Sequence, residues 1–324
     1  MKKSFLIFLI TAMCLFLYAC DDGGESGDSN FPDKDITLLV AYEAGGGTDT
    51  GARILQPYLE DELGVNVNIE NKPGGAGWVA WGELVSSNPD GYTLAYVNSP
   101  NLITGYLDPE YDRDNDLSDF QFIANHVLDP GVIAVKEDED RFEDFEEMIE
   151  YAQDHELTAT TSGVGSNDHM AILLMNENYD TNITPVHTDG AAEGSAQVIG
   201  GHTDLFVAKV GEAVDHVENG EMKAIAVDSE EKSPFLEDTP TTEELGYPEV
   251  NHRSSRGIAA PKDLPDDVLE KLSNALEKAI ENEEQIEQME EQGLEVEHLD
   301  PQEFEDRMKE DEDQVEDLSD LLGF

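Results

Sequence analysis

The stretch that decides the fold is ITLLVAYEAGGGTDTGAR, residues 36–53. It opens on a nearly continuous apolar run, residues 36–40, which is typical of a short strand buried on both faces. Three glycines, residues 45–47, then lead into a helical pattern. Glycine lets the backbone approach a ligand closely, and the first N–H groups of a helix attract anions such as carboxylates. The stretch therefore predicts either an anion-binding turn or an ordinary strand-to-helix turn, with Thr48 or Asp49 capping the helix.

The same succession of strand, polar turn and helix continues along the chain. Residues 65–70 alternate as a strand does, the glycine-rich turn NKPGGAG follows, and residues 78–86 form a helical pattern. A third strand, residues 92–97, ends in Asn98-Ser99-Pro100. Strands that alternate with helices predict a parallel sheet, whose ligands lie beyond the carboxyl ends of the strands. The three polar turns are therefore expected to meet at one rim of the sheet.

The second half of the chain repeats this arrangement. A short apolar strand, residues 131–135, follows Asp129-Pro130, and an amphipathic helix is expected at residues 142–155. A strand at residues 157–162 delivers the loop SGVGSN just before a helix at residues 169–176. Further helices are expected at residues 193–199, 265–291 and 301–322, and further strands at residues 203–207 and 222–227.

The first thirty residues have the composition of a processed leader and a tether. A basic start and the apolar run of residues 5–17 predict a secretory signal. The signal ends in LYAC, which resembles a lipobox with Cys20 as the lipidated first residue; plain secretion is the alternative. Residues 21–30 are almost wholly Gly, Ser, Asp and Glu and predict a flexible acidic tether. Since Cys14 would leave with the signal, no cysteine remains for a disulfide, a metal site or a thiol nucleophile.

Acidic residues far outnumber basic ones. The chain has 18 Lys plus Arg and 74 Asp plus Glu, so loss of Lys2 and Lys3 with the signal leaves 16 minus 74, or −58. Such a charge repels nucleic acid and anionic membrane surfaces. It also strains the compact state unless salt shortens the screening length to roughly 3 Å, as at about 1 M. Because the acidic residues are spread along the chain and not clustered for one basic partner, we expect an extreme halophile.

The sequence offers no constellation for catalysis or for a metal. The side chains of His187, His202, Asp189 and Asp204 are scattered without metal-ligand spacing. No Gly-x-Ser-x-Gly motif follows a convincing strand. His169, next to a helix start, is expected to cap or pack, and Arg53 is expected to pair with one of the many carboxylates. We therefore expect neither an enzyme nor a cofactor.

The order and spacing of the motifs resemble the solute-binding subunit of tripartite tricarboxylate transporters, also called the Bug family. The resemblance runs through GGGTDTGAR, NKPGGAG, PDGYTL, the loop SGVGS with His169, and the segment from Asp189-Gly190 to GGHTD at residues 200–204. One departure lies at Tyr42-Glu43-Ala44, where many members have a proline-rich turn. No single motif is specific, but together they cover the mature chain.

The resemblance implies an α/β, two-lobe periplasmic-binding fold of type II, with the ligand in the cleft between the lobes. Lobe 1 would comprise residues 31–129 plus 256–324, and lobe 2 would comprise residues 130–255. The ligand-binding residues expected from the turns and the resemblance together are Gly45, Gly46, Gly47, Thr48, Asp49, Asn98, Ser99, Ser162, Gly165, Ser166, His169, Asp189 and Asp204.

The expected function is that of a lipid-anchored, extracytoplasmic protein, a monomer, that captures a small organic carboxylate. It would deliver this solute to the membrane subunits of a tripartite tricarboxylate-type transporter. Two alternatives remain open: a sensing module that docks to a receptor, and an enzyme on the same scaffold. Which carboxylate is bound is not encoded in any motif.

Overall fold

The computed structural model describes residues 31–188, 190–229, 232–250 and 253–323. A compact unit begins at Pro32. The expected signal with its lipidation site at Cys20, the tether, and Asp189 lie outside the described residues. None of the helices in the described part of the chain is long and apolar enough to cross a membrane.

The first lobe is built on a six-stranded sheet in the order β11-β4-β10-β3-β1-β2. β1 (Ile36–Val40) pairs in parallel with both β2 (Val67–Asn71) and β3 (Thr93–Asn98), as the sequence predicts. The sheet is nevertheless mixed, because β10 (Ser254–Pro261) runs antiparallel to β3 and to β4 (Phe120–Asp129). The edge strand β11 (Glu295–Leu299) is also antiparallel to β4.

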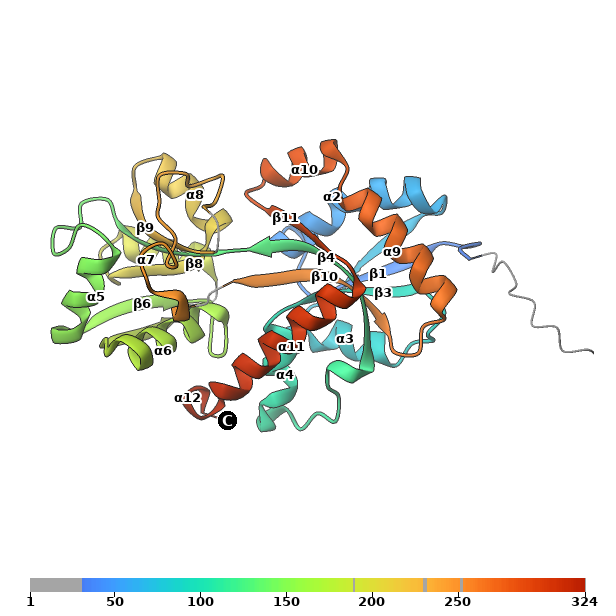
Figure 1. Cartoon of the computed structure of the whole chain (residues 1–324), viewed down its shortest axis with the longest axis horizontal. Coiled ribbons are helices and arrows are strands. Elements are labelled where there is room, and N and C mark those ends of the chain that lie inside the picture. The colour runs from blue at the N-terminus through green and yellow to red at the C-terminus, as the bar shows by residue number, and fades with distance from the viewer. Residues whose placement is uncertain (1–30, 189, 230–231, 251–252, 324) are drawn as a thin grey trace, which may run out of the picture. The chain divides into compact units, whose positions relative to one another are not determined.

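Helices cover both faces of this sheet (Figure 1). They are α2 (Gly47–Leu63), α3 (Trp78–Val85), α4 (Asn101–Leu107), α9 (Asp266–Ile280), α10 (Glu283–Glu290), α11 (Pro301–Asp317) and α12 (Ser319–Leu322). The single helix expected over residues 265–291 is wrong, because the chain breaks between α9 and α10. Asn282 starts the second helix there, and its side-chain oxygen accepts hydrogen bonds from the N–H groups of Glu284 and Gln285.

The second lobe has a five-stranded sheet in the order β7-β6-β8-β5-β9. β6 is parallel to both of its neighbours, whereas β5 is antiparallel to β8 and β9. The strands are β5 (Gly131–Lys136), β6 (Leu157–Thr161), β7 (Ile183–His187), β8 (Leu205–Lys209) and β9 (Met222–Asp228). The helices are α5 (Phe145–Asp154), α6 (Asn167–Tyr179), α7 (Ala191–Ile199) and α8 (Val210–Glu218). Two apolar clusters fill the lobe, one around Phe145 and Met175 and one around Phe206 and Val210.

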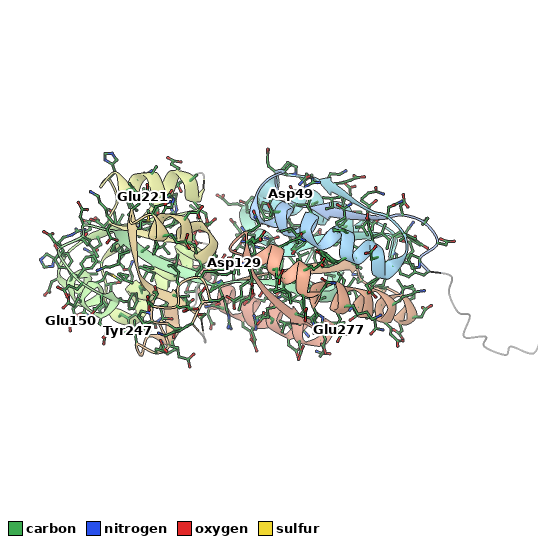
Figure 2. All side chains as sticks on the ribbon, turned by 90° about the horizontal axis from the view of Figure 1, so that it is seen from above. Asp49, Asp129, Glu150, Glu221, Tyr247 and Glu277 are labelled. Atoms are coloured by element: carbon green, nitrogen blue, oxygen red, sulfur yellow. The ribbon has the colours of Figure 1, made fainter. Side chains whose placement is uncertain are left out.

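Two passages of the chain join the lobes. β4 ends at Asp129 in the first sheet and β5 begins at Gly131 in the second, and the return enters the first sheet at Ser254. The two passages lie side by side, since Ser254 of β10 pairs with Asp129 of β4 (Figure 1). The charged residue Asp129 therefore stands where the lobes meet (Figure 2).

Candidate functional site

A cavity of about 440 Å³ lies between the lobes, at the carboxyl ends of β1, β3 and β6. Polar loops from both lobes converge on it, as the sequence predicts for the rims of two such sheets. Its wall consists of Tyr42, Gly46, Gly47, Thr48, Asn98, Asn101, Ser162, Ser166, Asn167, Asp168, Lys209, Glu212, Ser254 and Arg256.

The glycine turn brings the start of α2 to this cavity. The N-cap is Gly46, which has no side chain to satisfy the first N–H groups, so the expected cap by Thr48 or Asp49 is wrong. The first helical bond runs from Thr50 N to Gly46 O, 2.9 Å, which leaves the N–H groups of Gly47 and Thr48 without a helical acceptor. Such a helix start, with its dipole, is suited to hold an anion.

Asp49 supports the turn and does not line the cavity. Its carboxylate accepts hydrogen bonds from Gly45 N at 2.8 Å, Arg53 Nε at 2.9 Å and Asn71 Nδ2 at 2.8 Å. Burial opposes the charge on Asp49, but these hydrogen bonds outweigh it and lower the pKa of the carboxyl. Gly45 adopts a φ of +88°, which favours glycine, and its N–H is already used by Asp49. Arg53 pairs with a carboxylate, as expected from the sequence.

Two neighbouring residues at the end of β3, Asn98 and Ser99, point to different places, one to the cavity and the other to the interior of the lobe. Asn98 lines the cavity and donates from Nδ2 to Thr48 Oγ1 at 2.9 Å, while its buried Oδ1 has no partner among the described residues. Ser99 turns away, because its hydroxyl donates to the carboxylate of Asp311 on α11. Ser99 N also donates to Ser255 O at 2.9 Å, so this residue fastens β3 to β10.

In the second lobe, the loop after β6 presents the start of α6. Ser166 caps the helix by accepting a hydrogen bond from His169 N at 3.2 Å, so α6 begins at Asn167, two residues before the expected start. His169 is buried and packs its ring edge-on against His187 at 4.9 Å between centroids. Its Nδ1 accepts from Gly165 N at 3.2 Å, and burial, then the charge of His187, lowers its pKa to about 4. His169 and Gly165 thus shape the loop and do not line the cavity.

Asp204 lies away from the cavity. It immediately precedes β8, and its carboxylate accepts hydrogen bonds from Thr158 N and Oγ1 at 2.7 and 2.6 Å and pairs with Arg141 at 2.8 Å. The cavity is at the other end of β8, at Lys209, which a five-residue strand places roughly 17 Å away. The Asp204 carboxylate therefore stabilises the end of the second sheet that lies opposite the cavity.

Two ion pairs at the cavity, which together we call the cavity floor, were not predicted from the sequence. Lys209 Nζ pairs with Asp168 Oδ1 at 3.0 Å, both buried, and Arg256 pairs with Asp129. The Asp168 carboxylate also accepts from Ser162 N at 2.9 Å. A signal was available, because Lys209 ends the apolar strand LFVAK in a chain with only 18 basic residues. Within the described residues, no group of three or more His, Cys, Asp or Glu side chains could hold a metal ion.

Two further hollows adjoin or lie outside this site. One, of about 260 Å³, shares Gly47, Glu212 and Arg256 with the cavity and extends past them to Gln292 and Leu294. The other is larger, about 530 Å³, but it lies in the first lobe alone, between the start of β4 and α11. It includes none of the predicted polar turns, so the cavity between the lobes is the candidate site.

Comparison with known proteins agrees with this architecture. The sequence profile of the tripartite tricarboxylate transporter family receptors, TctC, matches residues 52–323. Protein BugT of Bordetella pertussis is 23% identical over 291 residues, 88% of this chain and 88% of that protein. A TctC solute-binding protein from Polaromonas superposes with a TM-score of 0.80 at 24% identity, covering 90% of this chain and 99% of that one. MatC from Rhodopseudomonas palustris, solved with bound malate, superposes with a TM-score of 0.74 at 25% identity, covering 89% and 99%. With the two-lobe fold, the cleft and most of the sequence in agreement, the chain belongs to the tripartite tricarboxylate transporter family receptors.

Proposed function

We propose that this protein captures a small organic carboxylate between its lobes and delivers it to the membrane subunits of a tripartite tricarboxylate-type transporter. One observation carries the proposal: helix starts from different lobes, α2 at Gly47 and α6 at Asn167, line the same cavity. Each helix start has first N–H groups without a helical acceptor and carries about half a positive charge. Membership of a receptor family that works outside the cytoplasm and the malate bound by MatC support this function.

The floor charges favour recognition by neutral donors. Lys209 and Arg256 are each paired with a carboxylate, so neither offers a free positive charge to a ligand. The hydroxyl groups of Thr48 and Ser162 and the amides of Asn98 and Asn101 surround the cavity. A carboxylate held by N–H groups of both lobes would stabilise the arrangement in which the lobes meet, which is how a ligand drives hinge closure.

The proposal is tested by a thermal-shift screen of the chain without residues 1–20, in molar KCl, against carboxylates and amino acids. A ligand at a hundred times its dissociation constant adds about 2.7 kcal/mol, which should raise Tm by several degrees. A selective carboxylate hit is expected. A folded protein with no hit among the carboxylates would contradict the proposal. Chemical turnover of the ligand that was found would favour an enzyme. Binding of a ligand without a transporter partner would favour a sensor.

A matched pair of glycine substitutions places the binding in this cavity. A Cβ at Gly47 would lie 2.7 Å from Arg256 Nη1, so Gly47→Ala displaces the guanidinium at the cavity wall. We expect about tenfold weaker binding, equivalent to about 1.4 kcal/mol. Gly82 lies within α3 with nothing near its Cβ position, so Gly82→Ala should bind as the wild type does. Equal affinities for the two variants would place the ligand elsewhere.

We also propose the finer features that the sequence suggests. Residues 1–20 direct secretion, Cys20 carries the lipid anchor, residues 21–30 are the tether, and the mature protein works as a monomer at high salt and does not catalyse a reaction. The supporting features are the LYAC motif and the charge of −56 for the whole chain. Radiolabelled lipid should be incorporated by the wild type and not by Cys20→Ala.

The lobe boundaries, residues 31–129 plus 256–324 and residues 130–255, are likewise proposed. The passage of the chain between the two sheets after Asp129 and before β10 supports them.

A further inference from the structure

Glu212 is an acidic side chain in a cavity that we propose binds an anion. It lies in the first turn of α8 and contributes to the cavity wall and to the adjoining hollow of about 260 Å³. Its Oε2 accepts a hydrogen bond from Lys209 N at 2.9 Å, which leaves Oε1 to face other partners. A carboxylate here would repel a carboxylate ligand unless something neutralises it.

The charges around Glu212 cancel without it. Two carboxylates approach from neighbouring elements, namely Asp168 on α6 and Asp129 on β4. Two cations pair with them, Lys209 with Asp168 and Arg256 with Asp129, while Asp228 on β9 interacts with Lys209 and Arg253. The remaining neighbours on the hollows around Glu212 are uncharged, including Ala191 and Gly194 of α7 and Gln292 and Leu294 after α10. The floor is therefore neutral when Glu212 is protonated and carries −1 when it is ionised.

The environment of Glu212 makes protonation easy near neutral pH. The Glu212 side chain remains partly exposed, because it lies on the walls of the cavity and of the adjoining hollow. Its desolvation between these walls and the charge of Asp168 raise the pKa of Glu212 to about 7. A bound carboxylate would exclude further water from this space and add a negative charge, and both changes raise the pKa further. By linkage, the ligand then binds the protonated form more tightly.

We propose that Glu212 receives the ligand as a neutral acid, so that capture of each carboxylate takes up one proton from solvent. The inference rests on the proposed function. The proton adds to Glu212, the ligand stays an anion, and no other bond changes. Glu212 then selects ligands: a plain carboxylate gains a neutral O–H donor, whereas an ammonium-bearing ligand would prefer the ionised side chain.

The test is isothermal calorimetry of the chain without residues 1–20, in molar KCl, with malate, succinate, citrate and benzoate as probes. Titrations at pH 6, 7, 8 and 9, in buffers of different ionisation enthalpy, measure affinity and proton uptake together. We expect affinity to fall about tenfold between pH 6 and pH 8, with close to one proton taken up at pH 8. The proton count needs only the wild type, so it stands even if a variant fails to fold.

Two variants assign the proton. Glu212→Gln keeps a neutral donor in place, so its affinity should stay constant from pH 6 to pH 8 and match the wild type at pH 6. Glu218→Gln alters an exposed carboxylate at the far end of α8 and should keep the wild-type pH profile. A wild-type affinity for the plain carboxylates that is independent of pH overturns the inference alone. Absence of binding by every probe at every pH overturns the proposed function, and the inference falls with it.

Discussion

The two helix starts that face the cavity use the same local device with opposite electrostatic results. In each, an aspartate in the first helical turn accepts a hydrogen bond from the N–H of the preceding loop: Asp49 from Gly45, and Asp168 from Ser162. Asp49 then pairs with Arg53, whose side chain is 49% exposed and outside the cavity. Asp168 pairs with Lys209, whose side chain is 9% exposed and on the cavity floor. The first loop therefore keeps its anchoring charge out of the site, and the second places it inside.

The largest expected effect is a difference in unfolding free energy between alanine variants of these two aspartates. Asp168→Ala removes the carboxylate that pairs with the buried ammonium of Lys209, which costs about 3–5 kcal/mol. Asp49→Ala leaves a half-exposed Arg53 that water can solvate, and the lost hydrogen bonds should cost about 1–3 kcal/mol. Denaturant unfolding in molar KCl measures both.

A double substitution checks the reason for this difference. Asp168→Leu with Lys209→Met removes both charges from the floor, and stability should recover most of the loss, since apolar replacements of buried pairs are often neutral. Equal costs for Asp168→Ala and Asp49→Ala would show that burial of the partner cation does not distinguish the two loops.

The second expected effect is a dependence of folding stability on pH, and it arises in the second loop alone. The pKa of His169 is lowered to about 4 in the folded protein, first by burial, and is about 6.5 when unfolded. The neutral ring is therefore the stable folded form: its contribution is complete above about pH 6.5 and is lost as pH falls towards 4. At pH 5 the loss should be about 2 kcal/mol.

His169→Gln tests this assignment because it cannot take up the proton. The variant should lose less stability than the wild type between pH 7 and pH 5. His155→Gln, at an exposed ring, serves as the control and should follow the wild-type curve. Parallel curves for wild type and His169→Gln would rule out the histidine as the source.

The sequence predicts those parts of the fold whose signals are local. β1, β2 and β3 with their parallel pairing, and α2 and α3, follow from apolar runs, helical spacing and glycine turns. β4 was missed because its run is interrupted by Asn125 and His126, which are fully buried. Their partners are distant in sequence: Gln285 and Tyr96 contact His126. Nothing within a short window shows that such polar residues will be buried.

Residues of the site could likewise be predicted only where their sequence signals are local. The turn residues Gly46, Gly47 and Ser166 could be placed at the rim because they follow strands in a predicted parallel sheet. Arg256 could not, because β10 enters the first sheet only after the chain returns from the second lobe. Gly257 beside it is required by that sheet, since a Cβ would lie 2.4 Å from Ala124 O. Long-range pairing therefore determines which charges reach the cavity.

The smallest expected effect compares the two N-caps. Ser166 accepts a hydrogen bond from His169 N, so Ser166→Ala should cost about 1 kcal/mol of unfolding free energy. Gly46 makes no such bond, and its φ of −79° with a nearest neighbour at 3.6 Å admits an alanine, so Gly46→Ala should cost about 0.5 kcal/mol or less. Chemical unfolding of both variants, in the same salt, measures the difference. If Gly46→Ala were the more destabilising, the start of α2 would depend on glycine for a reason other than capping.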